Sequence, residues 1–453
     1  MNTIRGTALP DQRPSMHVLL LNQAFYPDVV ATAQHGKDLA DELVRRGHRV
    51  TAVASRSIYG KAGAVLPKRE DVHVEGGTRP IRIERVGASI FGKAGYAARI
   101  ADFALFYILA FSKVISTDRP DVVVSFTTPP FIGLVGIINR IVRGSKAVYW
   151  VMDLYPDLPV ACGVMKPHGL ATRFFEAVNR FILRHSDVDV VLGRCMQDLV
   201  LSKSTPAEKV RMISIWSDTD GMDPIEPAAN PVRAAMGIPP TDTVVMYSGN
   251  FGIGHDAQTI CRAMARLQGV PGLRFEFVGG GKRRGEVEKF IAAEKLTNVR
   301  WHDYAPREKL GPSLAAGDIH LISLKEGVEG IMVPSKLMGI LAVGRPSIFV
   351  GNPTSEVARV LTETNSGVVV REDDDAALAE AIKMLAGDPE RRRQMGENAR
   401  RALHGTYDAH TACRHWVELL EEVTGEKPRA SLAPEKSSHT TPGHASGHAS
   451  SHG

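Results

Sequence analysis

The sequence contains few cysteines, and no two of them are close together. There are four, Cys162, Cys195, Cys261 and Cys413, and none belongs to a Cys-x-x-Cys pair. This spacing gives neither the pattern of a zinc site nor a disulfide framework. A reducing compartment, the cytoplasm, is therefore expected.

An apolar segment at the N-terminus is also missing. The first fifteen residues carry Arg5, Asp11 and Arg13, and no apolar run precedes Met16. A secretory signal needs such a run. We therefore expect residues 1–15 to be a flexible N-terminus and the protein to stay inside the cell.

Long apolar runs are absent from the rest of the chain. The most apolar stretch, Phe103 to Phe111, is about half of the ~20 residues that a membrane-spanning helix needs. Lys93, Arg99 and Lys113 flank it. The stretch predicts either a helix buried in a core or a helix that lies on an anionic membrane surface, and its composition does not separate the two.

A strong charge of one sign is lacking too. Among 453 residues, 55 Lys and Arg stand against 50 Asp and Glu, a net charge of only +5. This excess does not indicate nucleic acid, which we exclude as a partner. The composition is that of a globular protein, and the length favours two domains.

Alternating strand and helix patterns fill the first half of the chain. An apolar run at 17–21 is followed by a helical pattern at 34–46. Further strands are expected at 49–54, 121–125, 147–152 and 188–192. This order predicts a doubly wound, Rossmann-like α/β domain over residues 16–216.

The alternation stops at 217–240 and then begins again. This stretch is rich in Pro, Asp and Ala and predicts an interdomain linker. A second Rossmann-like domain is expected over 241–405, with strands at 244–248, 274–278, 299–302, 319–324, 347–350 and 368–370. An amphipathic helix at 406–426 is expected to cross back over the domain interface.

The last segment, 427–453, predicts a disordered tail. It is rich in Ser, Pro, Gly, Ala and His and has almost no large apolar residues, so burial cannot offset the entropy of ordering it. His444, His448 and His452 recur every four residues. They can chelate a transition metal, but adventitious binding is the favoured interpretation.

Two glycine-rich turns follow strands of the second half. The first is Ser248-Gly249-Asn250-Phe251-Gly252-Ile253-Gly254-His255-Asp256, and the second is Gly279-Gly280-Gly281-Lys282-Arg283-Arg284. Glycines let backbone N–H groups approach a phosphate, and a helix N-terminus adds a partial positive charge. A turn that needs only flexible dihedrals is the alternative. We expect a diphosphate to bind Gly249, Asn250, Gly252, His255, Lys282 and Arg283.

A third loop, 329–336, follows the strand expected at 319–324 and contains Ser335 and Lys336. Open α/β sheets bind ligands at the carboxyl ends of their strands, so the three loops should converge on one site. We therefore add Ser335 and Lys336 to the expected diphosphate site.

Two loops of the first half should form the opposite wall of the cleft. Tyr26 and Pro27 follow the first strand, and Asp153 and Asp157 follow the strand at 147–152. Asp153 is the better catalytic candidate, although carboxylates at strand ends are as often helix caps. No metal site is expected, because the acidic runs at 187–189 and 373–375 open a strand and a helix.

Together these segments resemble the GT-B fold glycosyltransferases, specifically the retaining enzymes of family 4. Within that family the chain is similar to the branch that transfers fucosamine or N-acetylfucosamine in bacterial surface polysaccharide assembly. The resemblance covers 16–423. It is carried by Phe25-Tyr26-Pro27, Asp153-Leu154-Tyr155-Pro156-Asp157, Tyr247-Ser248-Gly249-Asn250, Pro334-Ser335-Lys336-Leu337 and Leu341-Ala342-Val343-Gly344-Arg345-Pro346.

The resemblance implies a nucleotide diphosphate donor, a UDP-sugar, held by the second domain with no cofactor required. It implies a polyprenyl-linked or glycan acceptor in the first domain, near Tyr26, Pro27 and Asp157, and attachment to the inner face of the cell membrane. Lys336 would stabilise the diphosphate, and Asp153 would orient the acceptor or the reacting sugar. The anomeric configuration would be retained without a protein nucleophile.

The chain departs from the family pattern at one place. Two glutamates eight residues apart are common there, but Ile331 and Gly339 stand at those positions. A sensor that binds donor without turnover therefore stays open. A nucleotide-sugar epimerase, which releases an altered sugar, also stays open because it can share the same two-domain fold.

Overall fold

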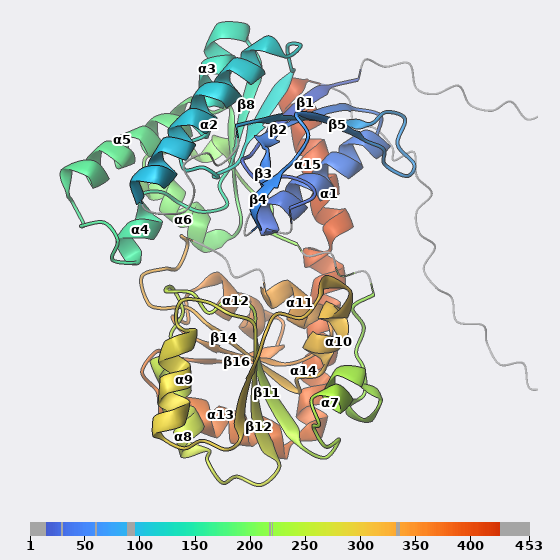
Figure 1. Ribbon diagram of the computed structural model, residues 1–453, viewed down its shortest axis with the longest axis vertical. Helices are drawn as coiled ribbons and strands as arrows, with labels where there is room; N and C mark the ends of the chain where they lie inside the picture. Colours follow the sequence, from blue (N-terminus) through green and yellow to red (C-terminus); the bar gives the residue numbers. More distant parts are fainter. Residues whose placement is uncertain are drawn as a thin grey trace, which may run out of the picture.

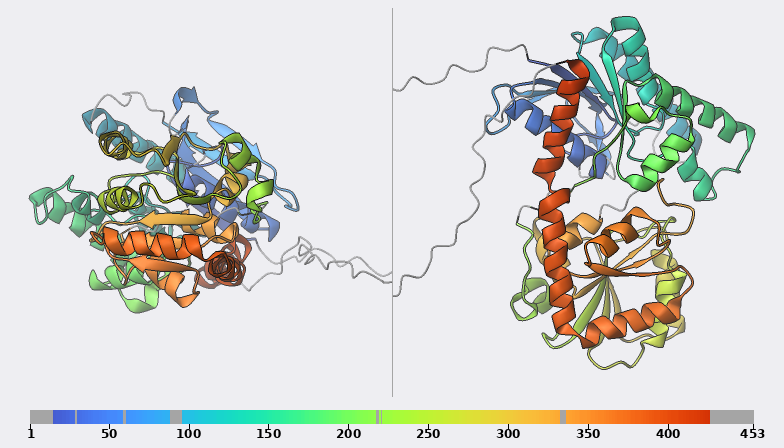
Figure 2. Two further views of the ribbon diagram at one scale, coloured as in Figure 1. Left: turned by 90° about the horizontal axis from the view of Figure 1, so that it is seen from below. Right: turned by 180° about the vertical axis from the view of Figure 1, so that it is seen from behind.

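The computed structural model describes residues 15–28, 30–58, 61–87, 96–216, 219, 221–331 and 336–425, and their side chains except at 61–64, 96–100 and 307. These residues form two α/β domains, one beyond the other along the longest axis, and the helical segment 389–424 runs along both (Figures 1 and 2). Each domain is built on a largely parallel sheet. The predicted fold class, two Rossmann-like domains, is confirmed.

The first domain contains an eight-stranded sheet of order β10-β9-β8-β7-β1-β2-β6-β5. Every pair is parallel except β5 with β6 at one edge. The strands are β1 (His17–Leu21), β2 (Arg49–Ser55), β5 (Arg69–Val72), β6 (Ile81–Val86), β7 (Val122–Ser125), β8 (Lys146–Trp150), β9 (Val188–Val191) and β10 (Val210–Met212), and β3 (Ser57–Ile58) pairs with β4 (Lys61–Val65) outside this sheet. β1 is buried at every position, as expected of a parallel strand covered on both faces.

Helices cover both faces of this sheet. Leu19 and Leu21 of β1 pack with α2 (Tyr96–Ser116) and α3 (Gly133–Arg143), and α5 (Leu170–His185) lies beside α3. The alternate residues Val18 and Leu20 belong to the core that includes α1 (Ala31–Arg45) and α15 (Ala409–Thr424). The shorter helices are α4 (Asp157–Ala161) and α6 (Arg194–Ser202).

The apolar stretch Phe103 to Phe111 lies within α2. Phe106 and Ala110 are buried against the sheet, whereas Ile108 and Phe111 are exposed on the outer side. The stretch is therefore a core helix on one side and an apolar surface on the other.

The second domain contains a six-stranded parallel sheet of order β13-β12-β11-β14-β15-β16. The order reverses beside β11, because β12 lies on one side of it and β14 on the other. Its elements are β11 (Thr243–Ser248), α8 (Gln258–Arg266), β12 (Leu273–Val278), α9 (Arg284–Ala293), β13 (Val299–His302), α10 (Leu310–Ala315), β14 (Ile319–Ser323), α11 (Lys336–Ala342), β15 (Ser347–Val350), α12 (Glu356–Glu363), β16 (Gly367–Val370), α13 (Asp375–Gly387) and α14 (Pro389–Ala402). Such a reversal is where doubly wound sheets bind ligands.

The expected linker at 217–240 is shorter in the structure. Asn230 caps α7 (Pro231–Ala235), and the buried Arg233 binds Asp318 at 2.9 Å. Because a buried charge requires such a partner, residues from 230 onward pack as part of the second domain.

The end of the chain returns to the first domain. After α14 a π-helical turn (Leu403–Tyr407) leads into α15, which packs on α1. Trp416 is fully buried with its ring centroid 4.3 Å from that of Trp150, and Glu421 lies 3.1 Å from His48. The segment 427–453 with its histidines lies outside the described residues.

Replacing Trp416 with alanine removes the largest contact of α15. We expect Trp416→Ala to lower the free energy of unfolding by about 3–5 kcal/mol, because it leaves a cavity beside Trp150. Urea unfolding followed by circular dichroism measures this. The exposed Glu418 on the same helix provides the control, since Glu418→Ala should change stability by less than about 0.5 kcal/mol. Equal effects of the two changes would show that α15 does not stabilise the first domain.

Candidate functional site

The two glycine-rich turns of the second domain lie against each other. Gly249 N donates to Val278 O at 2.8 Å, and Phe251 N donates to Gly280 O at 2.6 Å. Gly249 has φ +116° and Gly279 has φ +129°. A Cβ at Gly279 would lie 2.4 Å from Gly249 O, so only glycine permits this approach. The turns form one surface at the carboxyl ends of β11 and β12.

Lys336, the first residue of α11, reaches this surface. Its Nζ donates to the Tyr247 hydroxyl at 2.5 Å and lies 3.9 Å from the Tyr247 ring centroid. Its Cε lies 3.7 Å from the point where a Cβ on Gly249 would stand. Burial lowers the pKa of Lys336 from its ordinary value to about 7. A neighbouring anion would therefore convert a partly neutral amine into a full cation.

His255 is buried beside the same turn. Its Nδ1 lies 2.5 Å from Ser323 O, which can only accept, so Nδ1 carries the proton and Nε2 keeps its lone pair. Burial, with a smaller contribution from Lys336, lowers the pKa of His255 to about 3. His255 is therefore a neutral ring whose Nε2 can accept a hydrogen bond from a hydroxyl.

Arg283 joins the two glycine turns. It donates to His255 O at 2.5 Å and forms an ion pair with Glu286 at 2.9 Å. Lys282 and Asn250 are exposed. The residues expected to bind the diphosphate thus lie together in the second domain. Arg283 is already bonded to His255 O and Glu286, Lys282 faces solvent, and Ser335 lies outside the described residues.

Asp153 lies in the loop after β8, in the first domain. Its backbone N donates to Thr127 Oγ1 at 3.3 Å, which connects this loop to the one after β7. Within the described ranges its carboxylate forms no hydrogen bond or ion pair. Burial raises the pKa of Asp153 to about 6. An unbonded carboxyl that titrates near neutrality suits a role in binding or orienting a substrate hydroxyl.

Asp157 is occupied differently. Both Asp157 and Glu176 bind the amine of the buried Lys203 at 2.9 Å. The pair of carboxylates neutralises a cation that would otherwise be costly to bury. Asp157 therefore lies in the wall formed by the first domain, where its ion pair with Lys203 gives it a structural role.

Tyr26 and Pro27 are exposed in the loop after β1. The Tyr26 carbonyl accepts from the buried Arg85 at 2.6 Å, and Lys37 Nζ lies 5.4 Å from the Tyr26 ring. Gln23 N donates to Thr128 O at 2.8 Å, so this loop adjoins the loop after β7. The three loops of the first domain therefore form one edge.

The walls of the two domains meet at a backbone hydrogen bond. Leu154 N, next to Asp153, donates to Ile331 O at 3.1 Å. Ile331 lies in the segment that leads from β14 to Lys336. The structure thus brings the Asp153 loop and the Lys336 segment to one junction, between the carboxyl ends of both sheets.

Sequence reasoning missed three residues of this site. Tyr247 holds Lys336, and Thr127 holds the Asp153 backbone. Glu329 accepts from Gly327 N at 2.7 Å with one oxygen, and its other oxygen is buried with no partner in the described part of the chain. Tyr247 is the last apolar residue before the first glycine turn, and that position was the available signal.

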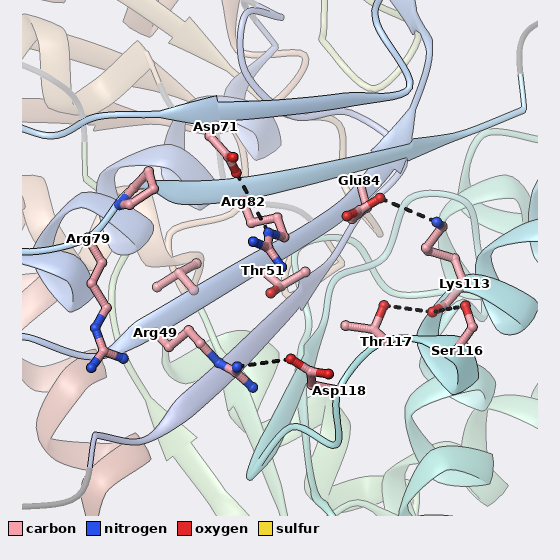
Figure 3. A pocket seen from close by; sticks show the side chains of 12 residues that line it. Arg49, Thr51, Asp71, Arg79, Arg82, Glu84, Lys113, Ser116, Thr117 and Asp118 are labelled. Carbon is pink, nitrogen blue, oxygen red and sulfur yellow. Dashed lines mark hydrogen bonds and ion pairs between the residues drawn. The ribbon is translucent and has the colours of Figure 1, made fainter.

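A separate cavity of about 330 Å³ lies at the opposite end of the first sheet, where β2 and β6 begin. Figure 3 shows that most of its charged side chains are paired with each other: Arg49 with Asp118, Arg82 with Asp71 and Lys113 with Glu84. Because the strands of the junction end at the other edge, this cavity is not part of the candidate site.

Acidic residues of the runs at 187–189 and 373–375 form ion pairs with arginines. Asp187 binds Arg140, and Asp373 and Asp375 bind Arg262. No group of three or more His, Cys, Asp or Glu among the described residues is arranged to hold a metal ion. In the same ranges, none of the helices has the length and apolar character needed to traverse a bilayer.

Two family profiles match consecutive parts of the chain. The glycosyl transferase 4-like domain matches residues 31–216, and the glycosyl transferases group 1 domain matches residues 230–402. The boundary agrees with the packing of α7 in the second domain.

Two bacterial proteins are similar to this chain in sequence. The chain is 29% identical to the glycosyltransferase WbjE of Pseudomonas aeruginosa over 266 residues, 58% of this chain and 66% of that protein. It is 22% identical to WcaI of Escherichia coli (strain K12), a glycosyl transferase assigned to colanic acid biosynthesis, over 86% of this chain and 96% of that protein.

Solved structures share the whole architecture. Sucrose-phosphate synthase from Thermosynechococcus elongatus has a TM-score of 0.73 at 18% identity, covering 90% of this chain and 99% of its own. HepE from Anabaena in complex with UDP-glucose has a TM-score of 0.64 at 14% identity, covering 90% and 100%. The chain belongs to the GT4-type glycosyltransferases of the GT-B fold, with a glycosyl transferase 4-like domain before a group 1 domain.

Proposed function

We propose that this protein transfers a sugar from a UDP-sugar to a polyprenyl-linked glycan in surface polysaccharide biosynthesis, with retention of the anomeric configuration. The observation that carries the proposal is the junction of Lys336 and the glycine turns with the Asp153 loop. The resemblance to WbjE and WcaI supports the pathway class, and UDP-glucose bound to HepE supports the donor class.

The second domain supplies the donor wall. The diphosphate lies on the backbone of the turns that begin at Gly249 and Gly279. The N–H groups of Asn250 and Gly280 stabilise its oxygens, because those of Gly249 and Gly279 are bonded to Val278 O and His302 O. Lys336 becomes fully protonated beside it and stabilises the charge that develops as the sugar departs. His255 Nε2 accepts a hydrogen bond from a donor hydroxyl.

The first domain supplies the acceptor wall. The acceptor hydroxyl attacks the anomeric carbon from the side that the diphosphate leaves. The new C–O bond forms as the bond from the anomeric carbon to the phosphate oxygen breaks, and the hydroxyl proton passes to that phosphate oxygen. Asp153 orients the acceptor hydroxyl or the reacting sugar, and the two domains supply proximity.

The first test of this function compares products. Purified protein is incubated with a panel of UDP-sugars and membrane lipid extract, and sugar on lipid is measured. We expect one donor to be consumed, and Lys336→Ala to lower kcat/KM by ~10²-fold or more, since it removes the cation beside the diphosphate. Lys289→Ala, an exposed lysine on α9, should be unaffected. Donor binding without product would indicate a sensor, and free altered sugar an epimerase.

A second test follows protons during UDP binding. Because the pKa of Lys336 is lowered to about 7, part of the amine is neutral at pH 8, and a bound diphosphate raises that pKa. We expect UDP binding at pH 8 to take up protons, measured by calorimetry in buffers of different ionisation enthalpy. Lys336→Met should abolish the uptake and Lys289→Met should retain it. The same uptake in both variants would assign the proton to another group.

A third test concerns Asp153. Its raised pKa of about 6 means that the carboxylate forms only as pH increases through this value, so kcat/KM should fall on the acid side of about 6. Asp153→Asn should lose at least ~10²-fold in kcat/KM while UDP affinity is retained. A variant that keeps its activity, or an unchanged acid limb, would remove Asp153 from the reaction.

A further inference from the structure

The cavity at the amino ends of β2 and β6 is large enough for a small organic molecule. Its volume of about 330 Å³ is at the lower end of the range for pockets that hold such ligands. Among the described residues that line it, only Val50 and Pro80 are apolar and none is aromatic. A nucleobase or an isoprenoid chain would therefore find little surface to pack on, and the lining favours a small polar ligand.

Basic side chains outnumber acidic ones in this lining. Three arginines gather on one side of the cavity in Figure 3, and we call them the arginine side: Arg49, Arg79 and Arg82. Lys113 is the fourth basic residue, against the acidic residues Asp71, Glu84 and Asp118. Arg79 forms no ion pair with the described residues, and its guanidinium donates to Ser15 Oγ at 3.1 Å. The arginine side therefore keeps a positive charge that no described acid neutralises.

The ion pairs of the other two arginines can be exchanged for a ligand. Arg49 lies 3.0 Å from Asp118, and Arg82 lies 3.7 Å from Asp71. All four side chains are at least 40% exposed. Exposed ion pairs contribute little to stability, whereas a phosphate group accepts two parallel hydrogen bonds from one guanidinium. The arginine side is therefore suited to bind a phosphate.

Thr51 supplies a hydroxyl donor at the buried floor of the cavity. Arg49 can only donate, and its Nη2 lies 2.7 Å from His17 Nδ1, whose distance to Arg119 O is longer, 3.4 Å. His17 Nδ1 therefore accepts, and Nε2 donates to Thr51 Oγ1 at 2.9 Å. Burial, with a smaller contribution from Arg49, lowers the pKa of His17 to about 4 and keeps the ring neutral. The hydrogen of the Thr51 hydroxyl has no acceptor in the part of the chain that the structure describes, so it can bind a ligand oxygen.

Oxygen acceptors lie across the cavity from the arginines (Figure 3), and we call them the acceptor side: Glu84, Ser116 and Thr117. Glu84 is mostly buried and binds Lys113 at 3.3 Å. The Ser116 and Thr117 hydroxyls both donate to Lys113 O, at 3.1 and 2.8 Å. Since their hydrogens are used, their oxygens can accept hydrogen bonds. Hydroxyl groups of a ligand are the donors that suit this side.

We propose that this cavity binds a sugar phosphate, whose phosphate lies on the arginine side and whose sugar hydroxyls lie on the acceptor side. The Thr51 hydroxyl donates to a phosphate oxygen. The cavity lies at the sheet edge opposite to the junction of the two domains, so this site is separate from both walls of the candidate site. The inference does not depend on the proposed transfer reaction.

Isothermal titration calorimetry of the full chain tests the ligand class. We expect glucose 1-phosphate or glucose 6-phosphate to bind at least tenfold tighter than inorganic phosphate, because the acceptor side adds hydrogen bonds to the hydroxyls. Glucose should bind at least tenfold weaker than the same hexose phosphate, because it lacks the charge. Equal affinities for inorganic phosphate and both hexose phosphates would overturn the assignment of a sugar phosphate.

Variants of the lining test the location. Arg79→Gln should weaken hexose phosphate binding at least tenfold, because it removes a charged hydrogen-bond donor. Arg173→Gln, at an exposed arginine of α5 that has no ion pair within the described ranges, is the matched control and should bind as wild type. Thr51→Val should weaken binding between about 2- and 10-fold, and Thr51→Ser, which keeps the hydroxyl, should restore it.

The donor wall of the second domain could also attract a phosphate, so it is tested separately. Lys336→Met should keep the hexose phosphate affinity of the wild type, and excess UDP should not displace the hexose phosphate. Loss of affinity in Lys336→Met, or displacement by UDP, would assign the ligand to the second domain and overturn the cavity site. Equal affinity of Arg79→Gln and Arg173→Gln would overturn it as well, whether or not the protein transfers a sugar.

Discussion

The candidate site depends on how two sheet edges are held against each other. Arg194, at the start of α6, binds Glu356 at 3.0 Å and Glu363 at 2.6 Å on α12, and its backbone N donates to Glu356 at 2.7 Å. These bonds connect the first domain to the second beside the Leu154–Ile331 hydrogen bond. An arginine that binds two carboxylates fixes the relative orientation of the two helices better than a single surface ion pair does. Because Arg194 is partly exposed, salt weakens this contact. Together with α15, it sets the separation of the two walls.

Burial shifts the pKa of one key residue on each wall, in opposite directions. In the second domain it lowers the pKa of Lys336, and in the first it raises the pKa of Asp153. Both changes favour the neutral form, because each group is removed from water without a full counter-charge. Substrate charges and hydroxyls can supply what is missing. Among the described residues, Lys336 and Asp153 therefore lack a partner of opposite charge until substrate binds. Asp157 and Arg283 already form ion pairs with protein side chains.

Much of the architecture could be predicted from the sequence, because buried parallel strands correspond to short apolar runs that are followed by helical patterns. The strands from 17–21 to 368–370 and the convergence of the glycine turns depend on local signals of this kind. The antiparallel edge strand β5, with alternating exposure, carries no such run. Asn230 and Pro231 are a local signal for the start of α7, but its packing in the second domain depends on the buried contact of Arg233 with Asp318, which is distant in sequence.

The site was predicted less completely for the same reason. Glycines and a lysine in loops after strands are visible in the sequence, but Tyr247 becomes the partner of Lys336 only when the first residue of α11 lies beside the end of β11. The sequence favours Asp153 over Asp157 as the catalytic candidate, but it does not show which protein groups contact either carboxylate. The structure distinguishes them through Lys203, the residue after α6, which among the described residues forms ion pairs with Asp157 and Glu176 and not with Asp153.

The positive φ angles show where each domain accepts a backbone cost. In the second domain glycine occupies the positions with φ above +100° at Gly249, Gly279 and Gly281, so the close turns carry no side-chain penalty. In the first domain a phenylalanine takes φ +67° at 131, where glycine would relieve the strain. The turn alone does not require a ring at this position. Phe131 contacts Tyr155 and Phe175, and these ring contacts keep a phenylalanine at this position despite the local backbone cost.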